Sequence, residues 1–187
     1  RLVNDYAAMS RGVAELGDAH FRVLHEGKIT DETAPVLVSG PGTGLGMASL
    51  LKTKSGRWWV LTGQGGHAMF APRTEREWAL KKQLEATYGY VSNELDLSGA
   101  ALAAVHKALC ELDGVAWQQT PPAVIMAQAE AGDTISREIC EIRSNATMGA
   151  LGDAALINGT RGGGVITGGG AKRLENWLAA PTALARF

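Results

Sequence analysis

A glycine-rich run at residues 40–46, GPGTGLG, is the part of this sequence best suited to hold an anion. Glycine at every second position lets backbone N–H groups turn toward one point without interference from Cβ atoms. A concave set of amides of this kind binds phosphate, and the hydroxyl of Thr43 adds a side-chain donor. An apolar stretch at 35–39 precedes the run and another at 47–53 follows it, so we expect two short strands joined at this turn.

The spacing of these glycines excludes two better-known phosphate loops. The run lacks the Lys-Ser/Thr ending of the P-loop nucleotide hydrolases. It reads G-x-G-x-G, and a strand follows where a dinucleotide-binding fingerprint needs a helix. Two interpretations stay open from these residues alone: a phosphate-binding turn, or a plain glycine-rich hairpin turn with no ligand.

Two further glycine clusters accompany polar side chains or a helix. The first, GQGGH at residues 63–67, places Gln64 and His67 beside exposed backbone, which suits a polyol as well as a simple turn. No second histidine or cysteine stands at metal-ligand spacing from His67, so we expect no metal site. The second, GGG at residues 168–170, lies between an expected strand and an expected helix at 171–180, as in an anion- or nucleotide-facing turn.

Three more polar residues could act on a hydroxylated substrate or have only structural roles. Asn4 and Asp5 stand immediately before an expected helix at 6–16, where either could be the N-cap. Asp5 could instead be a base at a strand-to-helix corner. Glu94 lies in a short polar loop, where plain solvation is the alternative to a binding role.

The elements that must position these residues mix strands and helices. A capping box at 74–77 opens one helix, and Asp133 caps another whose apolar stripe ends with Leu156 and Ile157. The end of a strand is expected at residues 1–3, and further strands at residues 21–25, 35–39, 47–53, 57–61 and 164–167. Strands early in the chain and again near residue 165, with helices between them, predict an α/β fold with a mixed sheet and flanking helices.

The length, charge and cysteine content narrow the class of protein. A chain of 187 residues suits one domain with a full core, and a net charge of −1 argues against a nucleic-acid or membrane-surface role. No apolar run approaches the roughly 20 residues of a membrane span. Cys110 and Cys140 read as buried thiols in a reducing compartment, so we expect a cytoplasmic protein. Because the sequence begins at Arg1, a targeting segment could have been lost upstream.

Taken together, these motifs resemble those of the bacterial glucokinases, sugar kinases of the actin-like ATPase (ribonuclease H-like) superfamily. The motifs occur in the family's order and at about its spacing, and they cover nearly the whole chain. The matching segments are VND at 3–5, GPGTGLG at 40–46, GQGGH at 63–67 with FAP at 70–72, VSNE at 91–94 with LSG at 97–99, and ITGGG at 166–170.

The resemblance implies ATP-dependent phosphorylation of glucose at its 6-hydroxyl, with Mg²⁺ accompanying the ATP. It makes Asp5 the general base, and it assigns the sugar hydroxyls to Asn4, Gln64, His67 and Glu94. It assigns the ATP phosphates to Gly40, Gly42, Thr43 and Gly44, and the adenosine motif to Gly168 and Gly169. Such chemistry depends mainly on positioning and charge stabilisation, plus a group that deprotonates the acceptor.

The sequence departs from the family in two places. The family has glutamate where this chain has Gln64, and hydrogen bonds to a charged group are roughly twice as strong as neutral ones, so sugar affinity or choice is in question. The family's N-terminal small lobe, with its Asp-x-Gly-Gly-Thr phosphate motif, and its closing C-terminal helix have no counterpart in residues 1–187. The resemblance therefore predicts a fragment: the large lobe of a two-lobed kinase with its hinge strand.

A second interpretation is a non-enzymatic sugar- or nucleotide-binding module descended from a sugar kinase, as in sugar-responsive repressors. Related repressors and kinases carry a zinc-binding cysteine cluster, which two distant cysteines cannot form. The kinase interpretation predicts glucose or a related hexose as partner, without nucleic acid or membrane, and the apolar helical surface leaves room for a homodimer. The preferred hexose and the choice between ATP and polyphosphate stay open.

Overall fold

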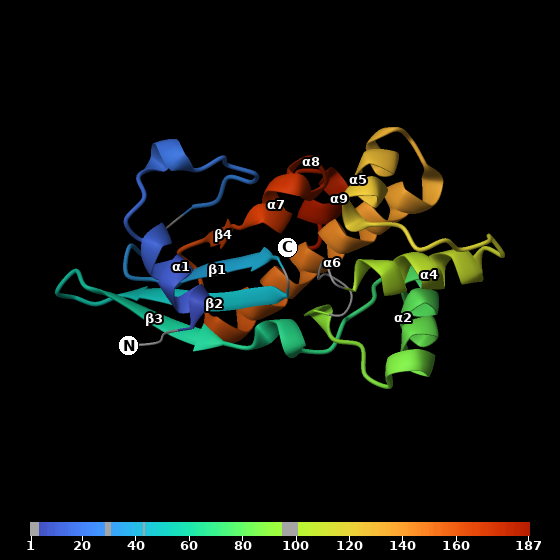
Figure 1. Ribbon diagram of the computed structural model, residues 1–187. Coiled ribbons are helices and arrows are strands. Elements are labelled where there is room, and N and C mark those ends of the chain that lie inside the picture. Colours follow the sequence, from blue (N-terminus) through green and yellow to red (C-terminus); the bar gives the residue numbers. More distant parts are fainter. Residues whose placement is uncertain (1–3, 29–30, 43, 95–100) are drawn as a thin grey trace.

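The computed structural model describes residues 4–28, 31–42, 44–94 and 101–187. Within these ranges the chain forms a four-stranded sheet in the order β3-β2-β1-β4 (Figure 1). The strands are β1 (Val36–Pro41), β2 (Leu45–Lys52), β3 (Trp58–Gly63) and β4 (Gly164–Ile166). The first three form an antiparallel meander, and β4 pairs with β1 in parallel, which confirms the predicted mixed sheet.

Helices make up most of the remaining described chain. They are α1 (Asp5–Val13), α2 (Glu75–Tyr88), α4 (Leu102–Leu112), α5 (Pro122–Glu130), α6 (Thr134–Asn158), α7 (Gly169–Arg173), α8 (Glu175–Leu178) and α9 (Pro181–Leu184). Short 3₁₀ turns lie at Asp18–His20 and Gly65–His67. None of the helices in the described part of the chain combines the length and the apolar composition needed to cross a bilayer.

The sheet is covered on both faces by helices from different parts of the chain (Figure 1). The α1 helix contacts β2 and β3, whereas α6 contacts β1. Because side chains alternate between faces along a strand, Leu45 and Met47 of β2 enter the core shared with α6, while Gly46 between them lies against Tyr6 of α1. The start of α1, which carries Asp5, thus lies against the face of the sheet opposite to α6.

The apolar core follows the predicted helical stripes along most of their length. Leu80 of α2, Leu109 of α4 and Ile139 of α6 are fully buried in one cluster. The end of the α6 stripe was wrongly predicted, because Leu156 and Ile157 are 84% and 82% exposed.

Two other predicted elements differ in the structure. Residues 21–28, all of them described, form no strand, and Val23 is 67% exposed, since this segment has no partner strand in the described part of the chain. Leu24 instead packs against the cluster that contains Leu174 and Leu178. The helix predicted at 171–180 is divided into α7 and α8 at Leu174, which is itself buried together with Leu178. The predicted strand end at residues 1–3 lies outside the described residues.

The two predicted helix caps are confirmed. Asp133 accepts a hydrogen bond from the Ser136 N–H (2.9 Å), and this contact with Ser136 holds the pKa of Asp133 below its ordinary value. Thr74 and Glu77 form the capping box that opens α2. Hydrogen bonds from the cap satisfy backbone N–H groups that have no partner inside the helix.

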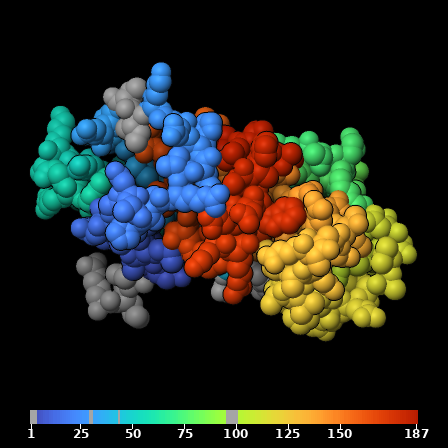
Figure 2. All heavy atoms as spheres, turned by 90° about the horizontal axis from the view of Figure 1, so that it is seen from above, coloured from blue at the N-terminus to red at the C-terminus, as the bar shows by residue number. Residues whose placement is uncertain are grey.

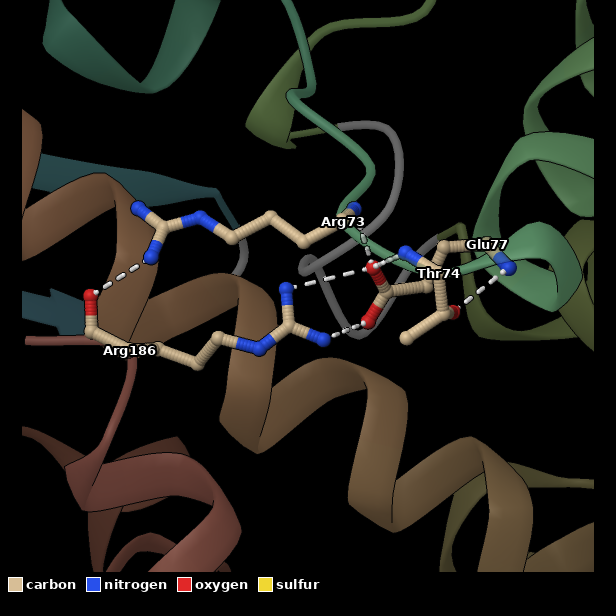
Figure 3. A network of polar contacts seen from close by, with 4 residues as sticks. All are labelled: Arg73, Thr74, Glu77 and Arg186. Carbon is tan, nitrogen blue, oxygen red and sulfur yellow. Dashed lines mark hydrogen bonds and ion pairs between the residues drawn. The ribbon is translucent and has the colours of Figure 1, made fainter.

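Glu77 also joins the start of α2 to the far end of the chain (Figure 3). Its carboxylate, 3% exposed, accepts a hydrogen bond from Arg186 Nη2 at 2.7 Å and another from the Arg73 backbone N–H at 2.6 Å. Arg73 in turn donates from Nη1 to the Arg186 carbonyl oxygen at 3.2 Å. The buried carboxylate is tolerated because the Arg186 guanidinium and the backbone N–H groups of Arg73 and Thr74 all donate to it.

We predict that Glu77→Ala lowers the free energy of unfolding by about 3–5 kcal/mol, because it leaves the Arg186 guanidinium buried without its partner. Urea denaturation followed by circular dichroism measures the loss. Glu75→Ala, an exposed neighbour in the same helical turn, is the matched control and should change stability by less than about 0.5 kcal/mol. Equal losses for the two variants would contradict the assignment.

Candidate active site

The glycine-rich run forms the turn between β1 and β2. Gly40 pairs with Gly46 and Pro41 with Leu45, so the turn itself comprises residues 42–44. The Gly42 N–H donates to the Gly44 carbonyl oxygen at 2.7 Å, which closes the turn. Thr43, the predicted side-chain donor, lies outside the described residues. The predicted hairpin of two strands is therefore present, with an exposed Gly42 at its tip.

The predicted base stands at the start of α1, which packs on this hairpin. Asn4, not Asp5, is the helix cap, since its Oδ1 accepts the Ala7 N–H at 3.0 Å. Asp5 is exposed, and its Oδ1 accepts the N–H of Tyr6 at 2.8 Å. The alternative that Asp5 serves as the cap is thus removed, and its carboxylate projects from the end of the helix nearest the hairpin.

Tyr6 brings this helix end against the hairpin. Its ring lies so close to Gly46 that a Cβ atom there would be 1.9 Å from Tyr6 Cδ2. Its hydroxyl donates to the Gly40 carbonyl oxygen at 3.2 Å. Burial, and then the charge of Asp5, raise the pKa of the Tyr6 phenol. The sequence analysis did not single out this residue, although an aromatic side chain next to Asp5 was a visible signal.

Glu94 and His67 meet at the other side of the hairpin tip. Backbone bonds bring their segments together, because the Phe70 N–H donates to Val91 O and the Asn93 N–H to Ala68 O, each at 2.9 Å. His67 Nε2 then lies 3.7 Å from Glu94 Oε2. The Glu94 carboxylate packs on the hairpin, since a Cβ atom on Gly44 would lie 2.7 Å from Glu94 Cδ.

Gln64 begins the same 3₁₀ turn that carries His67. Its carbonyl oxygen accepts the His67 N–H at 3.0 Å, and its exposed side chain has no hydrogen-bond partner among the described residues. The turn is held to the start of β2 by Gly66, where a Cβ atom would lie 2.2 Å from Leu45 O. The amide of Gln64 is therefore available to a ligand beside the Glu94–His67 pair.

The third glycine cluster reaches the same hairpin from β4. The Thr167 N–H donates to Ser39 O at 2.9 Å, and Gly170 packs so tightly that a Cβ atom would lie 2.0 Å from Pro41 O. Gly168 has φ +98°, a backbone conformation that other residues adopt only with strain. The predicted phosphate and adenosine motifs are thus adjacent in space although more than a hundred residues separate them in the chain.

The glycines of these motifs fall into two physical groups. Gly40, Gly44, Gly46 and Gly170 are close-packed against the protein's own atoms, so each admits another part of the chain. Gly42 and Gly169 face open space among the described residues: apart from neighbouring residues in the chain, the nearest atom lies 4.0 Å from a Cβ atom placed on Gly42, and none lies within 4 Å of one placed on Gly169. Only the second group leaves room for a ligand to approach the backbone, at the junction of the hairpin and the third cluster.

A separate cavity of about 720 Å³ lies away from the Glu94–His67 pair. It is bounded by residues 20–28, which lie beside the C-terminal helices in Figure 2, and by β4 and Phe187. Gly168 is at one end of it, but the single carboxylate in its described lining, Glu175, is paired with Arg22. The imidazoles of His20 and His25 also line this cavity, but the carboxylates of Asp5 and Glu94 lie at the hairpin and not in it.

Comparison with known proteins agrees with this geometry. A family model described as Glucokinase matches residues 1–187. The chain is 37% identical over 187 residues to a glucokinase of Chromobacterium violaceum, covering all of this chain and 53% of that protein. The chain thus spans about half the length of the curated relatives it matches.

Solved structures show the same fold. The crystal structure of a glucokinase from an Antarctic psychrotroph superimposes with a TM-score of 0.89 and 30% sequence identity, covering 98% of this chain and 57% of that one. A glucokinase of the ROK family from Streptomyces griseus, solved with glucose and AMPPNP, has a TM-score of 0.52 at 18% identity over 79% of this chain and 49% of that one, and so shares the fold. On the family match over its whole length, this chain belongs to the glucokinase family.

Proposed function

We propose that this chain is the large lobe of a glucokinase that transfers a phosphoryl group from ATP to the 6-hydroxyl of glucose. The observation that carries the proposal is the convergence on one glycine hairpin of the Asp5 helix end, the Glu94–His67 pair and the third glycine cluster. Membership of the glucokinase family supports the choice of glucose and ATP.

The sugar lies, in this proposal, between the start of α1 and the Glu94–His67 pair. Asn4 uses its Oδ1 as the helix cap, which leaves its amide Nδ2 to donate to a sugar hydroxyl. Glu94 and His67 present acceptor and donor groups within 3.7 Å of each other, and Gln64 adds an uncommitted amide. Several hydrogen bonds of known direction fix a hexose far better than one does, because each unmatched buried group costs binding energy.

Asp5 takes the proton of the 6-hydroxyl as that oxygen attacks. Its Oδ1 is held by the Tyr6 N–H, and its Oδ2 has no partner among the described residues, so one carboxylate oxygen fixes the orientation and the other accepts the proton. A positioned carboxylate contributes roughly a hundred- to ten-thousand-fold to such a step. A repressor-like binding module would need the sugar contacts but no base, so a carboxylate at this position favours the kinase in this proposal.

The nucleotide lies where the hairpin meets the third glycine cluster. Gly42 and Gly169 leave open space beside the backbone, so the phosphates fit against residues 42–44 and the adenosine near Gly168 and Gly169. In the described residues no group of three His, Cys, Asp or Glu side chains could cage a metal ion. Mg²⁺ would accompany the ATP, because it keeps several waters and is bound chiefly through nucleotide phosphates, where it would neutralise charge during transfer.

We also propose a cytoplasmic location. Cys110 and Cys140 are buried and form no disulfide with each other, and burial raises the pKa of Cys140 to about 11, so both behave as inert thiols suited to a reducing compartment. A homodimer through the exposed apolar helical surface is the proposed assembly. Equilibrium sedimentation of the full-length protein tests it, and a monomer at all concentrations would contradict it.

Asp5→Asn in the full-length protein should lower kcat by roughly a hundred- to ten-thousand-fold, because the amide cannot accept the proton. Glucose affinity, measured by calorimetry, should change less than about threefold, since the contacts that hold the sugar remain. Glu15→Gln, an exposed acid farther along the same segment, is the control and should leave kcat unchanged. A kcat within tenfold of the original enzyme would mean that Asp5 is not the base.

Gly42→Ala should raise the KM for ATP by about tenfold, equivalent to about 1.4 kcal/mol, because a methyl group would occupy space left for phosphate. The fold itself has room for it, as nothing lies within 4 Å except Gly44 O at 4.0 Å. Gly12→Ala, also open, is the control in coupled ATP assays. An unchanged KM for ATP would place the phosphates elsewhere.

Gln64→Glu should lower the KM for glucose by about fivefold, because a charged acceptor strengthens a sugar hydrogen bond by roughly 1 kcal/mol. The test compares glucose with mannose as substrates, so that a change of sugar choice is seen as well as a change of affinity. Gln119→Glu adds the same charge at an exposed distant position. If both variants have the original KM, the side chain at position 64 does not contact the sugar.

A further inference from the structure

We propose that Tyr6 is a positioning residue that holds the Asp5 carboxylate at the hairpin, and that Gly46 is glycine in order to admit the Tyr6 ring, not to bind phosphate. The proposal rests on the proposed function for what Asp5 does. The packing part of it, Tyr6 against Gly46, stands on the contacts alone. The proposal divides the glycine-rich run at residues 40–46 into glycines that leave room for phosphate and glycines that allow other parts of the chain to pack closely.

The contact between ring and glycine is closer than any side chain at position 46 would allow. A Cβ atom on Gly46 would lie 1.9 Å from Cδ2, 2.0 Å from Cε2 and 2.6 Å from Cγ of Tyr6. Real Cβ atoms essentially never approach another heavy atom within 3.0 Å. The ring therefore lies flat over the strand at a position where only hydrogen is present.

Backbone conformation does not explain the glycine at this position. Gly46 is absent from the described glycines that have positive φ, so an alanine could adopt its backbone conformation without strain. It is paired within the sheet with Gly40 and is flanked by the buried Leu45 and Met47. Among the described atoms, the Tyr6 ring is what excludes a side chain there.

Gly40 is a different case, which supplies a matched control. A Cβ atom on Gly40 would lie 1.8 Å from the backbone oxygen of Thr167 and 2.7 Å from the Tyr6 hydroxyl. Thr167 directly follows β4, and its N–H donates to Ser39 O of β1, so its backbone cannot move aside without disturbing the contact between these strands. Removal of the Tyr6 ring would relieve the crowding at Gly46 but not at Gly40.

The ring positions the base because the two residues are consecutive in the chain. Asp5 and Tyr6 are linked by the 2.8 Å bond from the Tyr6 N–H to Asp5 Oδ1, and the Tyr6 hydroxyl is tied to Gly40 O. The first turn of α1 is thus fixed at a side-chain anchor and at its cap, Asn4. Without the anchor the carboxylate could shift by an ångström or so, and a misplacement of that size costs roughly a hundredfold in rate.

A double-mutant cycle on the full-length enzyme tests the proposal. We expect Tyr6→Ala to lower kcat by about 10- to 100-fold with the KM for ATP within about twofold, and Gly46→Ala to lower kcat similarly. In the Tyr6→Ala background, Gly46→Ala should cost less than about twofold more, because no ring remains to clash. Tyr6→Phe, which keeps the ring, should retain at least about a third of kcat.

Gly40→Ala is the control, and it should be equally harmful with and without the ring. If Gly46→Ala costs the same in both backgrounds, or raises the KM for ATP in both, Gly46 serves the phosphate and the proposal is wrong. A Tyr6→Ala kcat within twofold of the original would also overturn it, since the base would then be held without the ring.

The packing is tested separately by urea denaturation of the original protein, Tyr6→Ala, Gly46→Ala and the double variant. Gly46→Ala should lower the free energy of unfolding when the Tyr6 ring is present and should not lower it in the Tyr6→Ala background. This result does not depend on whether the protein phosphorylates glucose. Should Tyr6→Ala fail to fold, Tyr6→Leu supplies the ring-free background. If neither kcat nor stability shows coupling between positions 6 and 46, the proposed packing is wrong. If stability shows the coupling but the original enzyme does not phosphorylate glucose, only the proposed function is wrong.

Discussion

Close approach of backbone at the end of β1 is the constraint on which the rest of the site depends. At Gly40, Gly46 and Gly170 the chain passes within distances that a single Cβ atom would forbid. Three segments distant in sequence, the start of α1, the β1–β2 turn and the turn after β4, can meet only because these positions lack side chains. Such dense packing leaves these segments little room to move. The residues of the site are therefore held in position before any ligand binds.

The elements that sequence patterns predicted well are those whose stabilisation is local. The two strands around the glycine run, the capping box at Thr74 and the cap at Asp133 each depend on residues within a few positions of one another. The choice between Asn4 and Asp5 as cap stayed open because both side chains are capable of it. It is resolved by one hydrogen bond, from the Ala7 N–H to Asn4.

The errors arose where tertiary contacts decide. Leu156 and Ile157 continue the apolar spacing of α6, but whether another element covers them is decided by tertiary packing and not by the sequence of the helix, and both are exposed. The strand predicted near Val23 lacked a partner, which no local pattern could reveal. The role of Tyr6 was missed for the same reason, because its meaning depends on a glycine forty residues away.

The ion pair of Glu77 with Arg186 links residues 109 positions apart, and it has a consequence for how the chain folds as it is made. While a ribosome is still synthesising the middle of the protein, the α2 carboxylate lacks its guanidinium partner, and β1 lacks β4 along one side. Nascent chains acquire such long-range contacts late, since closing a large loop must precede any gain from it. These contacts can therefore form only once β4 and Arg186 have left the exit tunnel.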